Sequence, residues 1–476
     1  MRFKVKNLGF IKSGHFETND LTVIFGKNNS GKTYLSYASY IIAKEIKENL
    51  SIYGSIGLDI ERKISKLGDV PSFDLNIETI FGNKNLSIIK KLINSSFAKS
   101  FNVKDSYFSK TQIEFDFKSF LNKAISSSFD LMLSTQFVDK NVLITKKKGS
   151  NLINILLIKK NKSESGYFEK VDTDSQKTIS HYFYNFQVPS AIIDRIIDLD
   201  IKNPFVITSE RTGIEMFYKE MDNNRSTIAE NLTITTLIKN NKEKKAKELN
   251  DIMDNKISKY SKPISDNIRT IRNQQEIRKH PSEISLSENF PKLSESLKKI
   301  TMGKFMTSIL GDTVYLMDGH DSHEIPLHAA SSSIKSMTMI DLYINHIASY
   351  GDTLIIDEPE LNLHPDNQIM MAELIVRLVN SGVKVIMTTH SDYLVRELNN
   401  RIKLFSANKN NKFYKEIVSG EFDTIKSDRV NVFNINEAGI IEQIKVTKYG
   451  INDVIFDDVI IKSAEREDII ESMIEG

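Results

Sequence analysis

Short apolar blocks, each followed by a polar or glycine-rich segment, mark the strands that this sequence predicts. Residues 21–25 precede a glycine-rich loop, and residues 34–50 have the spacing of apolar positions typical of a helix. Two further apolar runs, residues 353–356 and 383–389, have the length of buried strands and end in polar or charged residues. Because parallel strands place their carboxyl ends at one edge of a sheet, we expect the residues after these three strands to meet there.

Other parts of the pattern predict hairpins and short strands. Two apolar runs flank the turn Asp318-Gly319, and the apolar residues 151–158 lie between two lysine clusters. The lysines are Lys146, Lys147, Lys148, Lys159, Lys160 and Lys162, which we expect on a solvated face or a binding surface. After Glu397 the sequence predicts an acidic terminal helix and, before it, four short strands at residues 401–408, 413–419, 429–435 and 439–446.

The amino-acid composition mainly excludes certain kinds of site and certain classes of protein. The 476 residues include no Cys and no Trp, which excludes disulfides, thiolate metal sites and cysteine nucleophiles. Hydrophobic residues make up 40% and charged residues 26% of the chain, as in a folded globular protein. The amino-terminal residues lack a signal-peptide pattern, and no apolar run is long enough for a membrane-spanning helix. We therefore expect a cytoplasmic protein that makes no membrane contact.

The formal net charge of +2 is an average over segments of opposite charge. Residues 239–279 are predominantly basic, and residues 415–476 are predominantly acidic. Such runs form either solvated faces or surfaces for nucleic acid and oppositely charged proteins, so near-neutrality does not exclude charged partners.

The loop after the first strand matches the phosphate-binding pattern G-x-x-x-x-G-K-[ST] at every fixed position, between a strand and a helix as the pattern requires. Gly26 and Gly31 allow the backbone to curl so that its N–H groups face phosphate oxygens. The positively charged side chain of Lys32 can reach the β- and γ-phosphates, and the Thr33 hydroxyl is a ligand for Mg²⁺. The predicted ATP-binding residues of this loop are Gly26, Lys27, Asn28, Asn29, Ser30, Gly31, Lys32 and Thr33.

The second half of the predicted site follows two later strands. Asp357 and Glu358 end the strand at 353–356, where Asp357 is placed to hold Mg²⁺ and Glu358 to activate the attacking water. His390 ends the strand at 383–389 and is expected at the same edge, near the γ-phosphate or the water. The predicted catalytic residues are therefore Lys32, Glu358 and His390, and the predicted metal ligands are Thr33 and Asp357.

Most of the chain separates Thr33 from Asp357, so a large insertion must lie between the two halves of the site. A strand-end Asp-Glu pair followed by a strand-end His, after a long insert, is the organisation of ABC-type ATPases. Residues 329–336, here named the serine segment, precede a predicted helix and supply hydroxyl and N–H donors with one positive charge. Their predicted nucleotide-binding residues are Ser331, Ser332, Ser333 and Lys335.

These motifs predict an α/β fold with an ABC/SMC-type P-loop ATPase core, a mixed sheet with flanking helices, a helical insertion and an additional α+β lobe. The predicted segments are the core with the P-loop (1–45), the α+β lobe (46–185), a core strand region (186–213), the helical insertion (214–300), the core with the serine segment, the acidic strand and the His (301–405), and the carboxy-terminal strands and acidic helix (406–476).

With these motifs in place, the chain resembles OLD-like, SMC-related ATPases of bacterial phage defence, such as the ATPase subunits of PARIS and Septu systems. The likeness is carried by residues 26–34, 207–214, 259–268, 325–336, 354–365 and 388–398. It implies a homodimer or larger homo-oligomer in which two protomers lie head to tail and each supplies its serine segment to the other's ATP. In the family, residues 207–211 lie on a core strand, and Glu210 and Arg211 either face the nucleotide or pack structurally.

The resemblance also implies what this chain does with its ATP. The segment after Glu397 is too short for the TOPRIM nuclease domain of full-length OLD proteins, and Asp457-Asp458 is not its Asp-x-Asp pattern. We therefore expect a scaffold and sensor subunit that controls a separate TOPRIM- or HNH-type nuclease or a toxin, with a phage protein as trigger. The alternative is a Rad50/SMC-like DNA-repair ATPase, which predicts long coiled-coil arms and strong duplex binding. A transporter ATPase is disfavoured because the serine segment departs from LSGGQ.

A second cluster, His320, Asp321, His323 and Glu324, contains metal-ligand residue types. Because it lies in the hairpin around Asp318-Gly319, we interpret these residues as exposed turn positions.

Overall fold

The computed structural model describes residues 1–54, 72–81, 83–135, 138, 140–160, 173–220, 260–309, 312–319, 324–418, 420–452, 465–467, 469–470 and 473. They group into two compact units that are each discontinuous in sequence. Unit 1 comprises residues 1–17, 37–205 and 351–353, and unit 2 comprises residues 18–36, 206–350 and 354–476.

The sheet of unit 2 is built on strands that are buried on both faces. β3 (Leu21–Gly26) lies between β14 (Lys384–Thr388) and β15 (Val430–Ile435), and it pairs with both in parallel. β13 (Asp352–Asp357) lies beside β14, and β16 (Ile440–Ile444) pairs antiparallel with β15. β9 (Lys202–Ile207) has its first four residues in unit 1. The apolar runs predicted as buried strands are confirmed, because β3, β14 and β13 are buried over almost their whole length.

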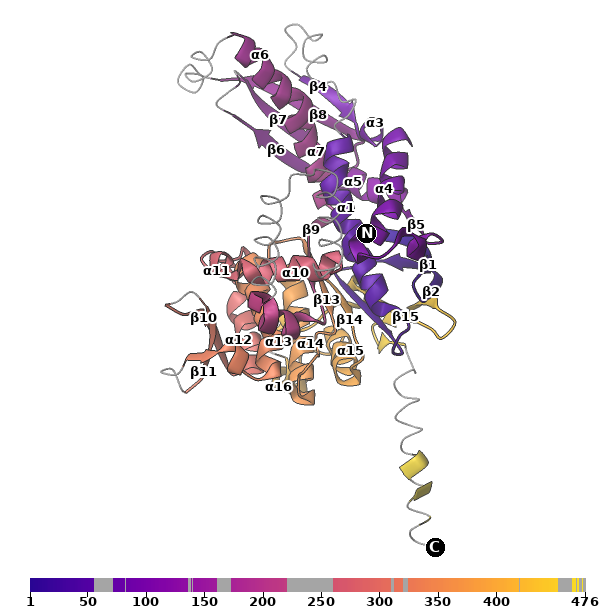
Figure 1. The fold of residues 1–476 in the computed structure, drawn as a ribbon, viewed down its shortest axis with the longest axis vertical. Helices are drawn as coiled ribbons and strands as arrows, with labels where there is room; N and C mark the ends of the chain where they lie inside the picture. Colours follow the sequence, from indigo (N-terminus) through magenta and orange to yellow (C-terminus); the bar gives the residue numbers. More distant parts are fainter. Residues whose placement is uncertain are drawn as a thin grey trace, which may run out of the picture. The chain divides into compact units, whose positions relative to one another are not determined.

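Helices cover this sheet, and several begin directly after its strands. α14 (Pro365–Asn380) follows β13, and α15 (Asp392–Phe405) follows β14. α1 (Lys32–Gly54) follows β3 and belongs to unit 1 from Tyr37 onward. Ser391 caps α15 by accepting a hydrogen bond from the Leu394 N–H at 3.0 Å, and Pro365 takes the first position of α14, where no backbone donor is needed. Figure 1 shows α14 and α15 with α12 (Phe290–Thr301) and α13 (Ser332–Leu342) beside β13 and β14. The predicted fold class, an α/β fold with a mixed sheet and flanking helices around a P-loop, is confirmed.

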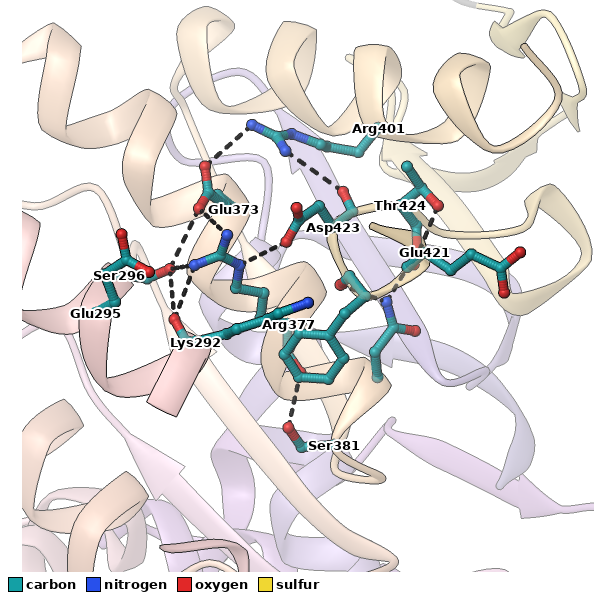
Figure 2. A network of polar contacts seen from close by, with 12 residues as sticks. Lys292, Glu295, Ser296, Glu373, Arg377, Ser381, Arg401, Glu421, Asp423 and Thr424 are labelled. Atoms are coloured by element: carbon teal, nitrogen blue, oxygen red, sulfur yellow. Dashed lines mark hydrogen bonds and ion pairs between the residues drawn. The ribbon is translucent and has the colours of Figure 1, made fainter. Parts of the chain in front are cut away.

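A buried polar network joins three of these helices (Figure 2). Arg377 of α14 donates from Nε to Asp423 Oδ1 at 2.8 Å and from Nη1 to Ser296 Oγ of α12 at 2.6 Å. It also pairs with Glu373 at 2.8 Å, and Arg401 of α15 donates to the other oxygen of Glu373 at 3.1 Å. Arg377 is 4% exposed, so this Arg377 network ties α12, α14 and α15 together inside the protein.

A small antiparallel sheet follows α12. β10 (Gly303–Thr307) pairs with β11 (Thr313–Met317), which pairs with β12 (Glu324–Pro326). The predicted hairpin around Asp318-Gly319 is confirmed as β11 and β12, while His320, Asp321 and His323 lie outside the described residues.

The prediction of four short strands after Glu397 is half wrong. Residues 401–408 mostly continue α15, and residues 413–419 lie largely in α16 (Lys412–Ile417). In α15 the buried residues Leu394, Leu398 and Ile402 recur every four positions, so the apolar spacing of a helix continues into the segment read as a strand. The other two predicted strands are β15 and β16, and β15 belongs to the central sheet.

Unit 1 contains two groups of strands. β1 (Arg2–Leu8) pairs antiparallel with β2 (Ile11–Glu17) and with β5 (Gln112–Phe115). A separate four-stranded sheet has the order β4-β8-β7-β6, formed by β4 (Ser72–Asn76), β6 (Phe129–Leu133), β7 (Lys140–Lys146) and β8 (Leu152–Lys159). The predicted strand at 151–158 is therefore β8, and it forms a hairpin with β7.

One lysine of the predicted charged clusters is buried. Lys146 is 2% exposed, and its Nζ donates to the carbonyls of Ile125, Ser127 and Lys147 at 2.8–3.1 Å. The carbonyls of Ile125 and Ser127 lie at the end of α5 (Phe117–Ser126), where a helix leaves acceptors without intrahelical donors, and Lys147 is the next residue in the chain after Lys146. The expectation of a solvated or partner-binding lysine is wrong at this position, and Lys162 lies outside the described residues.

The remaining elements of unit 1 are mainly helical. They are α3 (Ile77–Ile80), α4 (Asn83–Phe101), η1 (Asp105–Phe108), α6 (Thr173–Tyr182), the π-helical η3 (Phe183–Gln187) and α7 (Val188–Asp198). Phe97, Phe101 and Phe108 pack with ring centroids 5.1–6.1 Å apart and contribute to the apolar core of this unit.

Unit 2 also contains several short elements and the described part of the predicted helical insertion. They are α10 (Lys262–Arg272), α11 (Gln274–Ile277), η4 (Ile284–Leu286), η5 (Leu327–Ala329), the π-helical η6 (Tyr343–Ile347), η7 (Glu421–Asp423), η8 (Ser427–Arg429), β17 (Val446–Thr447) and β18 (Gly450–Ile451). Residues 221–259, with half of the basic run, and residues 453–464 of the acidic tail, with Asp457-Asp458, lie outside the described residues. Every helix in the described part of the chain is too short or too polar to cross a lipid bilayer.

Candidate nucleotide site

The glycine-rich loop leaves β3 in a conformation that ordinary residues disfavour. Gly26 has φ +148° and Gly31 has φ +105°, and a Cβ on Gly26 would lie 2.9 Å from both the Ile435 carbonyl oxygen and Ser30 Oγ. Asn29 also takes a left-handed backbone conformation, with φ +62°. Ser30 Oγ is buried without a hydrogen-bond partner among the described residues, so the loop contains a polar atom that a ligand can satisfy.

Lys32 is the first residue of α1, and its side chain turns back over the loop. Its Nζ donates to the carbonyls of Gly26 at 2.9 Å and Lys27 at 2.8 Å. Burial lowers the pKa of Lys32 to about 8, although the carboxylates of Glu358 and Asp357 act in the opposite direction. The ammonium group therefore remains mostly charged at neutral pH.

Thr33 and Asp357 lie together although 324 residues separate them. Thr33 Oγ1 is 3.2 Å from Asp357 Oδ2, and the other oxygen of Asp357 accepts a hydrogen bond from Thr388 Oγ1. Burial raises the pKa of Asp357 to about 6, and the negative charges of Glu358 and Glu210 add to this effect. A hydroxyl and a carboxylate in this arrangement are the ligands that Mg²⁺ takes in P-loop proteins.

Glu358 and His390 face each other beside this pair. His390 Nε2 lies 3.7 Å from Glu358 Oε1, and both side chains are about one-third exposed, at 34% and 29%. Burial lowers the pKa of His390, and the positive charge of Lys32 lowers it further. The Glu358 backbone has φ +49°, and its N–H donates to Thr388 Oγ1 at 3.1 Å.

Glu360 supports the strand end that carries His390. Its Oε1 accepts hydrogen bonds from Thr389 Oγ1 at 2.8 Å and from the His390 N–H at 2.7 Å. Burial raises the pKa of Glu360. Its side chain therefore points into the protein and fixes the β14 edge of the site.

Arg211 connects three segments at the carboxyl end of β13. It is 1% exposed, and it donates from Nη1 to the Asp357 carbonyl at 2.9 Å and from Nη2 to the Glu358 carbonyl at 2.7 Å. Its Nε donates to the carbonyl of Ser336 in α13 at 3.1 Å. The sequence left open whether Arg211 faces the nucleotide or packs structurally; these bonds show that it packs, against the backbone that carries Asp357 and Glu358.

The serine segment forms the amino-terminal end of α13. Ser331 caps the helix by accepting a hydrogen bond from the Ile334 N–H at 3.3 Å, and Ser331 and Ser332 are exposed. Ser333 is half-buried, and Lys335 is 8% exposed. The hydroxyls at the helix end, more than the lysine, are therefore accessible to an anion from outside the subunit.

The outer part of the loop differs from its base. Lys27, Asn28 and Asn29 are exposed, and Lys27 Nζ forms an ion pair with Glu437, in the turn between β15 and β16. Gly31 and Lys32 are buried and Thr33 is half-buried, so the loop has an exposed outer part and a buried base.

The structure brings Lys32, Thr33, Asp357, Glu358 and His390 to one sheet edge. Sequence reasoning missed two supporting contacts: Thr388, which bonds Asp357 and the Glu358 backbone, and the inward-facing Glu360. The Thr388-Thr389 pair directly before His390 was the available signal, since hydroxyl side chains at a strand end can orient neighbouring carboxylates. The donor set fits a nucleoside triphosphate with Mg²⁺.

A comparison with protein families points to the same class. The sequence matches the family model described as AAA ATPase domain over residues 1–395. No curated protein matches the sequence. Among solved structures, the chain is similar to an SMC head bound to the C-winged helix domain of ScpA, with a TM-score of 0.33 and 11% identity over 93% of this chain and 96% of that chain. It is also similar to an Smc head domain with an extended coiled coil bound to the C-terminal domain of ScpA, derived from Pyrococcus furiosus, with a TM-score of 0.30 and 12% identity over 98% of each chain.

The family match spans the P-loop, the serine segment, the Asp357-Glu358 strand end and His390, and it covers far more than half of the sequence. The chain therefore belongs to the AAA ATPase domain family.

Proposed function

We propose that this protein hydrolyses ATP at the site formed by the P-loop, Asp357, Glu358 and His390. The observation that carries the proposal is the approach of Thr33 Oγ1 to Asp357 Oδ2 at 3.2 Å, with Glu358 and His390 facing each other beside them. The loop N–H groups and Lys32 bind the phosphates. Thr33 and Asp357 would hold Mg²⁺, which would neutralise phosphate charge.

Glu358 and His390 have different roles toward the attacking water. The Glu358 carboxylate accepts a proton from the water and orients it toward the γ-phosphate. His390, kept neutral by burial and by Lys32, donates a hydrogen bond to the water or to a γ-phosphate oxygen. Thr388, Glu360 and Arg211 position these groups and do not touch the reacting atoms.

Two copies of the chain close around ATP in the proposed mechanism. Ser331, Ser332 and Ser333 lie at or next to the amino-terminal end of α13, two of them exposed, which supports their use as γ-phosphate donors for a second subunit. Lys335 adds positive charge to the same helix end without being exposed itself.

We further propose that this ATPase is a cytoplasmic scaffold and sensor of an anti-phage complex that controls a separate nuclease or toxin. The support is the order of its motifs and the serine-rich form of the segment before α13. Isolation of the native complex tests this role: an effector should co-purify, and Lys32→Ala should abolish protection against phage. Retained protection with no effector would refute it, and salt-sensitive duplex binding would favour the Rad50/SMC-like alternative.

The variant Glu358→Gln tests the proposed hydrolysis. It removes the general base but keeps the shape of the side chain, so we expect ATP affinity to be retained and kcat to fall by about 10²-fold or more. Phosphate release and equilibrium ATP binding measure the two quantities. Glu114→Gln changes an exposed carboxylate of unit 1 and should leave kcat unaltered. Hydrolysis by Glu358→Gln at the rate of the unaltered protein would contradict the role of Glu358.

A further inference from the structure

Unit 2 contains a cavity of about 460 Å³ that is separate from the P-loop site. One wall comes from Glu215, Met216 and Lys219 in the helical segment 211–220. The rest comes from the β10–β11 hairpin, β12 and η5, which contribute apolar side chains including Val314 and Leu327. This volume is in the range of cavities that hold small organic ligands or a single long side chain.

Glu215 is the polar group that the fold leaves incomplete in this cavity. It is 6% exposed, and its Oε1 accepts a hydrogen bond from Gln274 Nε2 at 3.4 Å. Gln274 is itself fixed by Thr313 Oγ1, which donates to its side-chain oxygen at 2.8 Å. Glu215 Oε2 is buried and has no hydrogen-bond partner among the described residues. A buried carboxylate oxygen without a donor is costly, so a ligand that brings a donor gains affinity here.

Two positive side chains act on Glu215, and both form an ion pair. Lys219 pairs with Asp312 at 2.6 Å, and Arg278 donates from Nη1 to the buried Asp341 at 2.9 Å, while its Nε and Nη2 are buried without a partner among the described residues. Glu324 adds a further carboxylate to the cavity wall. Glu215 and Glu324 therefore place carboxyl groups on the wall of this cavity, beside apolar side chains such as Val314 and Leu327.

Burial also makes the ionisation of Glu215 sensitive to a cation. It raises the pKa of Glu215 to about 7, in spite of the hydrogen bond from Gln274 and the positive charges of Arg278 and Lys219. A cation placed against the carboxylate would stabilise its charged form.

We propose that this cavity binds a primary ammonium or guanidinium group on an apolar stem, with the Glu215 carboxylate accepting a hydrogen bond from the cation. A free alkyl or aryl amine and the side chain of a lysine or arginine share this chemistry. The ligand would contact the helical segment that begins at Arg211 and the η5 turn that precedes Ser331, and both segments lead to the nucleotide site.

Ligand binding to the full chain tests this proposal directly. The probes are benzylamine, the neutral benzyl alcohol of similar shape, lysine acetylated on its α-nitrogen with a methylamide at its carboxyl end, and the norleucine analogue of that lysine compound. We expect benzylamine or the lysine probe to bind at least about tenfold more tightly than its neutral counterpart, as a charge-assisted hydrogen bond implies. Tighter binding of the lysine probe would point to a protein side chain as the natural ligand, and tighter binding of benzylamine to a free amine.

Glu215→Gln provides the matched variant. It keeps the size of the side chain and should weaken binding of the cation by about tenfold or more, with little effect on the neutral probe. Glu220→Gln, on the exposed side of the same helical segment, should bind both probes as the unaltered protein does. Thermal unfolding verifies that both variants are folded. Equal affinity for charged and neutral probes, or an unchanged cation affinity in Glu215→Gln, would overturn the proposal.

Discussion

Arg211 illustrates what single residues contribute that their motifs do not reveal. Its guanidinium group bonds the carbonyls of Asp357, Glu358 and Ser336, and thereby links the β13 edge to α13. A planar group with five donors suits this task, whereas a lysine ammonium cannot reach three carbonyls in the same geometry. Arg211 is a positioning residue in the proposed mechanism.

Replacing this side chain should separate hydrolysis from binding. In Arg211→Lys the Glu358 backbone loses its fixed donor, so we expect kcat to fall by about tenfold or more while the Kd for ATP changes by less than about threefold. Steady-state kinetics and equilibrium ATP binding measure the two values. A proportional loss of both, together with a lower melting temperature, would show that Arg211 serves only stability.

Glu215 predicts a pH dependence of stability. Its pKa is about 7 in the folded protein, against an ordinary value of 4.5, so the folded state holds this proton more tightly. The resulting stabilisation is fully present below pH 4.5 and is lost as pH rises through 7. By linkage it amounts to about 3 kcal/mol. Between pH 5 and pH 8, urea unfolding should show a larger loss of the free energy of unfolding in the unaltered protein than in Glu215→Gln. An equal loss in the two proteins would contradict the raised pKa of Glu215.

The site residues were predictable to different degrees. Gly26, Gly31, Lys32 and Thr33 follow from a local pattern, because the phosphate loop is continuous in sequence. The functions of Arg211 and Thr388 depend on bonds to segments 30 or more residues away, with no pattern of spacing that a single sequence can display. Their residue types were visible, but their partners were not.

Among the helices and strands, the strongest predictions were those with a buried apolar run of the right length. β3, β13 and β14 satisfy this condition, and their predicted positions are correct. The segment at 401–419 misled because short mixtures of apolar and charged residues fit both a strand and an amphipathic helix. The position of β15 beside β3 depends on the tertiary fold and not on local sequence, because the pairing joins residues about 400 positions apart.

The Arg377 network makes a prediction about how the helices are held. Arg377→Met leaves the buried carboxylate of Asp423 without its guanidinium partner, so we expect a loss of about 3–5 kcal/mol in the free energy of unfolding. The double variant Arg377→Met/Asp423→Leu removes both charges and should recover part of that loss. Denaturant unfolding of both variants measures the difference.

Arg396→Met serves as the control for this network. Arg396 is 50% exposed and pairs with Asp392 within α15, so its loss should cost less than about 1 kcal/mol. The losses of unfolding free energy in Arg377→Met and in Asp423→Leu alone give the sum to compare with the double variant. If the loss in the double variant equalled that sum, the Arg377–Asp423 pair would contribute no interaction energy.

At the scale of the whole molecule, the chain crosses between its two compact units several times. Unit 2 takes residues 18–36 from near the amino terminus and returns to the sheet after residue 354. The predicted segments, such as the core with the P-loop at 1–45, remain a prediction, and strand pairings such as that of β1 with β5 are not visible in the order of motifs.

The proposed closure around ATP predicts a change of mass. Glu358→Gln with ATP and Mg²⁺ should move from the 54.3 kDa of one chain to twice that mass in light scattering. Adding Ser331→Glu and Ser332→Glu should prevent this, because carboxylates repel the partner's γ-phosphate, while ATP binding to the P-loop is retained. Ser109→Glu, an exposed change in unit 1, should have no effect. A dimer that forms without ATP, or persists with the two glutamates, would contradict the mechanism.

At Glu358 the left-handed backbone conformation makes the residue that is best for stability different from the residue that hydrolysis needs. A non-glycine residue at φ +49° costs on the order of 1 kcal/mol, which glycine would not incur. Glycine would also remove the carboxylate on which the proposed hydrolysis depends. Selection for a more stable protein therefore favours a residue here that selection for turnover excludes. Lineages that no longer need hydrolysis would be expected to lose this glutamate early, and an inactive descendant with glycine at 358 would fold more stably than its active ancestor.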